Sequence, residues 1–157
     1  MGFADLVGFT ATSEELDETE LATMVDRFEA RVYEQVPEHQ GRVVKMIGDE
    51  VMFAADQVAD AVEIALGLIE AHAEDPALPD IRVGLAMGST LSWQGDLFGP
   101  TVNRASRVVN VARPASVLVS EEMVEPVRAL GRYAVRDLRG IRLRGIGKVR
   151  LSVVRRA

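Results

Sequence analysis

The order of apolar segments in the first 87 residues constrains the fold of this chain more than any other feature of its sequence. Short apolar runs typical of strands alternate with longer stretches in which apolar residues recur at helical spacing. In chain order, the pattern indicates a strand at 3–9, a helix at 21–37, strands at 42–47 and 50–54, a helix at 61–69 and a strand at 81–87. Gly48 and Asp49 separate two of these strands and are typical of a tight hairpin turn. The order matches a ferredoxin-like βαββαβ core, so we predict an α+β fold with an antiparallel sheet and helices on one face.

The remaining residues predict a C-terminal extension to this core. A glycine-punctuated excursion at 89–99 carries the single tryptophan, Trp93. After it, the pattern indicates a helix at 101–111, a strand at 117–119, a helix at 121–130 and strands at 133–138 and 149–154. No repeat or low-complexity linker divides the chain, so we expect residues 1–157 to form a single domain. Because the first strand begins almost at Met1, one expectation is a domain excised from a longer protein with an upstream regulatory region.

Charge and composition exclude several classes of function. Residues 1–80 carry 19 acidic and 4 basic side chains, whereas residues 81–157 carry 5 and 14. The net charge of −6 argues against nucleic-acid binding. The absence of cysteine excludes disulfides and thiolate chemistry, and two histidines make a His-based zinc site unexpected. No apolar run approaches the ~18 residues of a membrane helix, and no signal peptide is evident, so we expect a cytoplasmic domain without membrane contact.

Two carboxylates, Asp5 and Asp49, stand where a predicted strand gives way to a turn. In a ferredoxin-like sheet the first strand lies beside the strand of this hairpin, so both carboxylates can point at one spot. Such oxygen ligands suit Mg²⁺, and two metal ions ~3.5–4 Å apart can activate a hydroxyl and neutralise phosphate oxygens together. The simpler interpretation is that Asp5 caps a loop and Asp49 is only a turn residue.

Three further polar residues are candidates for nucleotide binding. Asn103 and Arg107 are four residues apart on a predicted helix, so an amide and a guanidinium on one face can reach a ribose oxygen and a phosphate. Lys45 interrupts an apolar run in a chain with only two lysines among its 18 basic residues, and its ammonium suits a single ring-nitrogen acceptor. A solvated helix face and an edge-facing lysine are the alternative interpretations.

Three ordered motifs together resemble the class III nucleotidyl cyclase catalytic domain, and specifically the bacterial adenylate cyclases. They are Phe-Ala-Asp-Leu-Val-Gly-Phe-Thr at 3–10, Lys-Met-Ile-Gly-Asp at 45–49, and Asp-Leu-Phe-Gly followed by Asn103 and Arg107 at 96–107. The resemblance covers residues 3 to about 154, nearly the whole chain. It implies an enzyme that converts ATP to 3′,5′-cyclic AMP and pyrophosphate.

The resemblance implies the ligands of the metals and of the base. Asp5 and Asp49 would bind two divalent cations, Mg²⁺ or Mn²⁺, with the carbonyl of Leu6 as a further ligand. Lys45 would donate to adenine N1, and Asp96 would accept from the N6 amine. Guanine carries a protonated N1 and a carbonyl at position 6, so the same pair disfavours GTP, by ~10⁴ or more where the polar groups are buried.

The resemblance also assigns the reacting end of the nucleotide. Asn103 would orient the ribose, and Arg107 would stabilise charge on the α-phosphate while the 3′-hydroxyl attacks and pyrophosphate leaves. The family often has a lysine near the C-terminus that reaches the terminal phosphates, and this chain has Ile146 at that position. Arg142, Arg144 and Lys148 are the neighbouring candidates for this role.

In this family the site lies between two protomers, so the resemblance implies a homodimer with composite active sites. Trp93 is a candidate interface residue, and a contact within the monomer is its alternative. The other readings of the function are a guanylate cyclase and a catalytically silent nucleotide-binding or dimerising module. A diguanylate cyclase is disfavoured because residues 47–50 read Ile-Gly-Asp-Glu rather than Gly-Gly-Asp/Glu-Glu-Phe.

Overall fold

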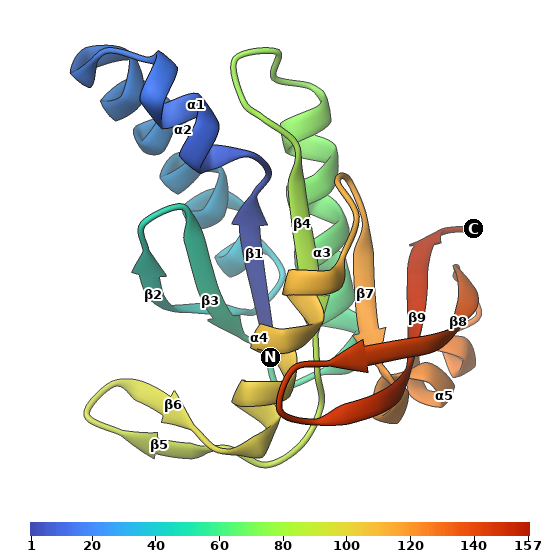
Figure 1. Ribbon diagram of the computed structural model, residues 1–157. Coiled ribbons are helices and arrows are strands. Elements are labelled where there is room, and N and C mark those ends of the chain that lie inside the picture. Colours follow the sequence, from blue (N-terminus) through green and yellow to red (C-terminus); the bar gives the residue numbers. More distant parts are fainter.

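The computed structural model describes all residues from 1 to 157 and forms one α+β unit (Figure 1). The elements of the core, in chain order, are β1 (Gly2–Leu6), α1 (Phe9–Glu15), α2 (Glu18–Glu38), β2 (Arg42–Ile47), β3 (Glu50–Ala54), α3 (Val58–Ala73) and β4 (Ile81–Leu85). The elements that follow are β5 (Leu91–Trp93), β6 (Asp96–Phe98), α4 (Pro100–Val111), β7 (Val117–Ser120), α5 (Glu121–Ala129), β8 (Tyr133–Leu143) and β9 (Gly147–Arg156). Every predicted strand and helix forms, in the predicted order, and α1, β5 and β6 are additional elements.

Seven strands form one sheet in the order β2-β3-β1-β4-β7-β9-β8. Its first four strands pair antiparallel, as the ferredoxin-like core predicts. The extension joins this core through a parallel pair, β4 with β7, and continues with antiparallel pairs to β9 and β8. The segment at 89–99 forms a separate two-stranded hairpin, β5 with β6.

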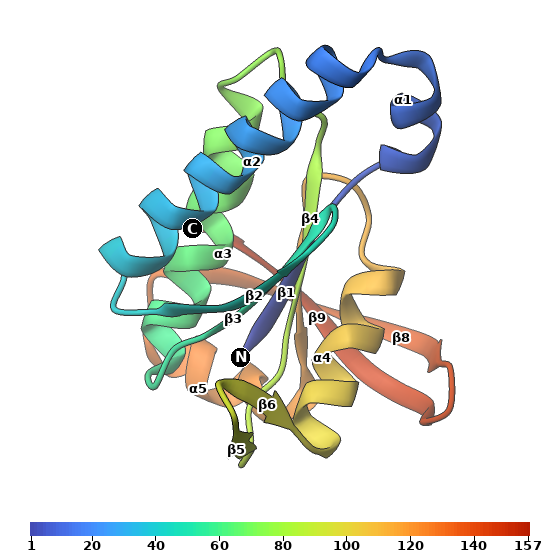
Figure 2. The same cartoon turned by 90° about the vertical axis from the view of Figure 1, so that its left-hand side faces the viewer.

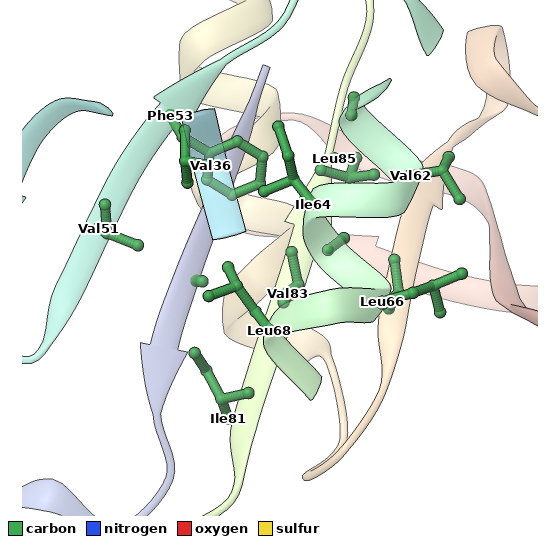
Figure 3. Close-up of a cluster of buried hydrophobic side chains, with 14 of the residues drawn as sticks. Val36, Val51, Phe53, Val62, Ile64, Leu66, Leu68, Ile81, Val83 and Leu85 are labelled. Carbon is green, nitrogen blue, oxygen red and sulfur yellow. The ribbon is translucent and has the colours of Figure 1, made fainter. Parts of the chain in front are cut away.

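Helices lie on both faces of the sheet (Figure 2). The core helices α2 and α3 share one face, as predicted, and contribute to a large buried cluster. Figure 3 shows part of it, where side chains of α3 such as Ile64 and Leu68 lie over those of β3 and β4. Helix α4, which belongs to the extension, covers the opposite face. It approaches β4 so closely that a Cβ on Gly84 would lie 2.3 Å from the backbone nitrogen of Val109. Only a glycine permits this contact between a helix and a strand.

The segment between β1 and α2 differs from the sequence prediction. Residues 10–17 were expected to supply only cap residues, yet Phe9–Glu15 forms the short helix α1. Asp17 does cap α2, because its side chain accepts from the Glu20 N–H while the Glu20 carboxylate accepts from the Asp17 N–H. None of the helices has the length and apolar character that crossing a membrane requires.

His72 is a polar residue inside the core. It is 3% exposed on α3, and burial lowers the pKa of its imidazole below the ordinary value of 6.5. The folded state therefore favours the neutral ring, whereas the unfolded chain takes up a proton as the pH falls through this value.

We expect the free energy of unfolding to contain a contribution from His72 that is fully present above pH ~6.5 and is lost as the pH falls below it. Urea unfolding of the wild type and of His72→Asn between pH 7.5 and 5 measures this contribution. The variant should lose stability less steeply. Equal slopes for the two proteins would contradict the buried neutral imidazole.

Candidate active site

The end of β1 and the β2–β3 turn hold the two predicted metal ligands side by side. Asp5 pairs in register with Glu50, the residue after Asp49, and the Leu6 N–H donates to the Asp49 carbonyl at 3.0 Å. Gly48 has a φ of +60°, which glycine adopts without strain and which allows the short turn. The two carboxylates are therefore brought to one end of the sheet, as the sequence predicted.

Burial and like charge perturb the acidic groups at this end. Burial raises the pKa of Asp49, and the neighbouring Asp5 carboxylate raises it further. Burial, followed by the charges of Asp5 and Asp49, raises the pKa of Glu50 to about 7. Such shifts mark a place where negative charge is concentrated and where a bound cation would be stabilised.

Arg82 is a functional candidate that the sequence reasoning missed. It lies on β4 directly opposite Asp5, and its guanidinium donates to the Asp5 carboxylate from Nε at 2.8 Å and from Nη2 at 2.6 Å. This pair offsets part of the negative charge around Asp5 and Asp49. The alternation of β4 placed Arg82 on the same face as Asp5, but only the strand register shows that the two side chains meet.

The donor set fits a hard divalent cation that completes its coordination with other oxygens. Asp5 and Asp49 offer carboxylate oxygens, and Leu6 contributes only its backbone there because its side chain is buried in the core. No group of three or more acidic or histidine side chains is arranged to hold a metal ion. Water and substrate phosphate oxygens would have to supply the other ligands, as is usual for Mg²⁺.

Lys45 and Asp96 meet at a second place on the same face of the sheet. The Lys45 ammonium donates to Asp96 Oδ2 at 2.6 Å, although the residues are 51 positions apart in sequence. The hydrogen bond from Lys45 lowers the pKa of Asp96, and the Leu97 N–H, 2.7 Å from Oδ1, lowers it further. The charged pair is partly exposed and is open to a ligand.

Asn103 and Arg107 lie one turn apart on α4 and are both exposed. Arg104, between them, is directed elsewhere and pairs with Glu122. The side-chain bonds of Asp5 are to Arg82, and those of Lys45 are to Asp96, so neither group engages Asn103 or Arg107.

The predicted site residues thus form separate groups within one chain. Lys45 on β2 lies two strands from Asp5 on β1, which is roughly 10 Å at the usual strand spacing.

The position where the family often has a phosphate-binding lysine is Ile146, which lies in the turn between β8 and β9. The basic residues around it, Arg142, Arg144 and Lys148, are all exposed. Trp93, on the β5–β6 hairpin, is 64% exposed.

Residues 1–155 match the adenylate and guanylate cyclase catalytic domain family, and the chain belongs to this family. The resemblance drawn from the three motifs is thereby confirmed.

Within this family, the chain is similar to proteins named adenylate cyclase. It is 46% identical over 125 residues to an adenylate cyclase of Streptomyces coelicolor, a match that covers 80% of this chain and 33% of the relative. It is 38% identical over 149 residues to an adenylate cyclase of Glutamicibacter nicotianae, covering 95% of this chain and 37% of the relative. The chain therefore spans about a third of the length of these relatives.

Solved structures support the fold. The catalytic core of a rhodopsin-guanylyl cyclase with converted specificity, in complex with ATPαS, superposes with a TM-score of 0.90 at 23% identity, covering 99% of this chain and 93% of that one. The adenylyl cyclase CyaB from P. aeruginosa superposes with a TM-score of 0.82 at 23% identity, covering 99% and 92%. At this identity the similarity shows the fold alone.

We expect Lys45→Met and Asp96→Asn to leave the midpoint of urea unfolding unchanged, because an exposed ion pair contributes little to stability. Urea titration followed by far-ultraviolet circular dichroism measures the midpoint. A large decrease in either variant would mean that the pair serves the fold and not a ligand.

Proposed function

We propose that this domain is an adenylate cyclase that converts ATP to 3′,5′-cyclic AMP and pyrophosphate in the cytoplasm. The observation that carries the proposal is the Lys45–Asp96 pair, which is already formed in this member of the cyclase family. The adenylate cyclase names of the relatives from Streptomyces coelicolor and Glutamicibacter nicotianae support the same reaction.

The Lys45–Asp96 pair supports adenine if Lys45 faces ring position N1 and Asp96 faces the substituent at position 6, the assignment that the family resemblance implies. Its donor and acceptor atoms lie 2.6 Å apart, so they present opposite polarity side by side. Adenine carries an acceptor at N1 and a donor at N6 on adjacent positions of one edge, and both can bond to the pair without separating it. Guanine presents the reverse pattern, which sets donor against donor and acceptor against acceptor.

The acidic end of the sheet is proposed to bind two divalent cations, Mg²⁺ or Mn²⁺, through Asp5, Asp49 and the Leu6 carbonyl. When bound, such ions neutralise phosphate oxygens and favour ionisation of the attacking hydroxyl. The bond formed joins the ribose 3′-oxygen to the α-phosphorus. The bond broken is the one to the pyrophosphate oxygen, and the hydroxyl proton is released to solvent. Arg82, already at this end, is placed to take part of the triphosphate charge.

The separation of the groups supports a composite site between two copies of the chain. In a two-fold homodimer, one copy would supply Asp5 and Asp49, while the partner would supply the base pair together with Asn103 for the ribose and Arg107 for the α-phosphate. The exposure of Asn103 and Arg107 on α4 leaves both free to meet a ligand held by the other copy. The relatives are about three times as long as this chain. We therefore also propose that an upstream region regulates the dimer.

Asp49→Ala should abolish cyclic AMP formation while leaving the protein folded. It removes charge at the reacting centre, where such losses lower turnover by at least about a hundredfold. Turnover with Mn²⁺ and ATP, measured alongside circular dichroism spectra, tests this expectation. Asp26→Ala, an exposed position on α2, provides a matched control that should retain turnover. Wild-type activity in Asp49→Ala would contradict the metal assignment.

ATP turnover should exceed GTP turnover, by up to ~10⁴ if the partner copy buries the Lys45–Asp96 pair around the base. Specific activity should also rise with protein concentration until dimers saturate. Both are measured in one titration with ATP and GTP in parallel. Comparable rates for the two nucleotides would indicate a guanylate cyclase, and absence of any cyclic product would indicate a silent binding module.

A further inference from the structure

Residues 75–80, which precede β4, contact the end of the sheet that carries the proposed metal ligands Asp5 and Asp49. The Val7 N–H donates to the carbonyl of Asp80 at 2.8 Å, immediately after the Leu6 N–H donates to the carbonyl of Asp49 at 3.0 Å. Backbone hydrogen bonds therefore hold the end of β1 from both sides. Any shift of residues 79–80 would be passed directly to Leu6 and Asp5.

His72, which lies in the core, forms a hydrogen bond to this segment. Its Nδ1 lies 3.0 Å from the carbonyl oxygen of Pro79, so Nδ1 carries the proton and donates. The ring packs edge-on against Phe28, with centroids 5.8 Å apart and an angle of 75° between planes. Its Nε2 is buried without any partner. A buried unsatisfied nitrogen is destabilising, and an apolar side chain would avoid that cost, so the bond to Pro79 is what the imidazole contributes.

The other end of the segment is fixed independently. The Asp75 carboxylate accepts from Arg27 Nη1 at 3.2 Å and from the Ala77 N–H at 3.1 Å, and Arg31 lies 3.6 Å away. The Leu78 N–H donates to the Asp75 carbonyl at 3.0 Å. Residues 75–78 thus form a turn closed by its own hydrogen bonds. His72 bonds to Pro79, the first of the two residues that connect this turn to β4.

We propose that His72 is a positioning residue for the cation site: its bond to Pro79 sets the place of Asp80 and, through Val7, of Leu6 and Asp5. The proposal rests on the assignment of Asp5, Leu6 and Asp49 as metal ligands. The imidazole itself touches neither metal nor nucleotide. Its influence passes through two hydrogen bonds, one from its own Nδ1 to the Pro79 carbonyl and one between the backbones of Val7 and Asp80.

Three variants at this position separate the hydrogen bond from the packing. His72→Leu fills the space and removes the donor. His72→Asn keeps an amide donor near the position of Nδ1, whereas His72→Gln places its amide near Nε2, which faces no acceptor. Leu68→Ala is the control, because it opens a cavity in the buried cluster one turn earlier on the same helix and leaves His72 and its bond to Pro79 in place.

The measurement is Mn²⁺ binding to the nucleotide-free protein by isothermal titration calorimetry, so it does not depend on turnover. We expect His72→Leu and His72→Gln to weaken Mn²⁺ binding by about two- to tenfold, the effect of one hydrogen bond. His72→Asn should bind Mn²⁺ like the wild type, and so should Leu68→Ala despite its lower stability. If His72→Leu does not fold, the comparison of Gln with Asn decides the question.

The outcomes distinguish this inference from the proposed function. Loss of Mn²⁺ binding in Asp49→Ala, together with wild-type binding in His72→Leu or His72→Gln, would overturn the role of His72 alone. Equal weakening in Leu68→Ala would also overturn it, because general destabilisation would then be the cause. Wild-type Mn²⁺ binding in Asp49→Ala would overturn the metal assignment and the role of His72 with it.

Discussion

Repulsion between two carboxylates held at one end of a sheet is the constraint on which the rest of this structure depends. Asp5 and Asp49 come from separate segments and are joined by the pairing of β1 with β3. Their neighbour Glu50 adds a third acidic group, and the pKa of Glu50 is raised to about 7. The fold sustains this arrangement because β1 is central, with hydrogen-bonded strands on both sides, and because Arg82 on β4 supplies one opposing charge.

Much of the fold could be predicted from the sequence because its signals are local. The apolar periodicity and the Gly48-Asp49 pair report on neighbouring residues, and they gave the order of elements in the core. Helix α1 was missed because residues 9–15 bury no side chain, so no apolar stripe marks them. The parallel pairing of β4 with β7 could not be read either, since it depends on where the chain returns after α4.

The site residues likewise divide into those that local motifs identify and those that only the strand pairing identifies. Asp5, Asp49, Lys45, Asp96, Asn103 and Arg107 were found through three motifs, and the structure brings together the first two and the next two of them. Arg82 was missed because its role depends on its cross-strand partner Asp5, 77 positions away in sequence.

The uneven charge of the two halves of the chain says little about the ligand. Glu18 and Glu20 belong to the first turn of α2, where acidic side chains stabilise a helix start, and so the net charge of −6 says little about the sign of the ligand.

The close seating of α4 on Gly84 has a mechanical consequence. With no Cβ between helix and strand, α4 has little freedom to slide on β4, so Asn103 and Arg107 keep a fixed relation to Arg82 and to the sheet. In a symmetric pair of such rigid bodies, the gap across the shared site would be set by the relative orientation of the two copies. Turning one copy against the other would then open or close both sites at once, with no rearrangement inside either fold.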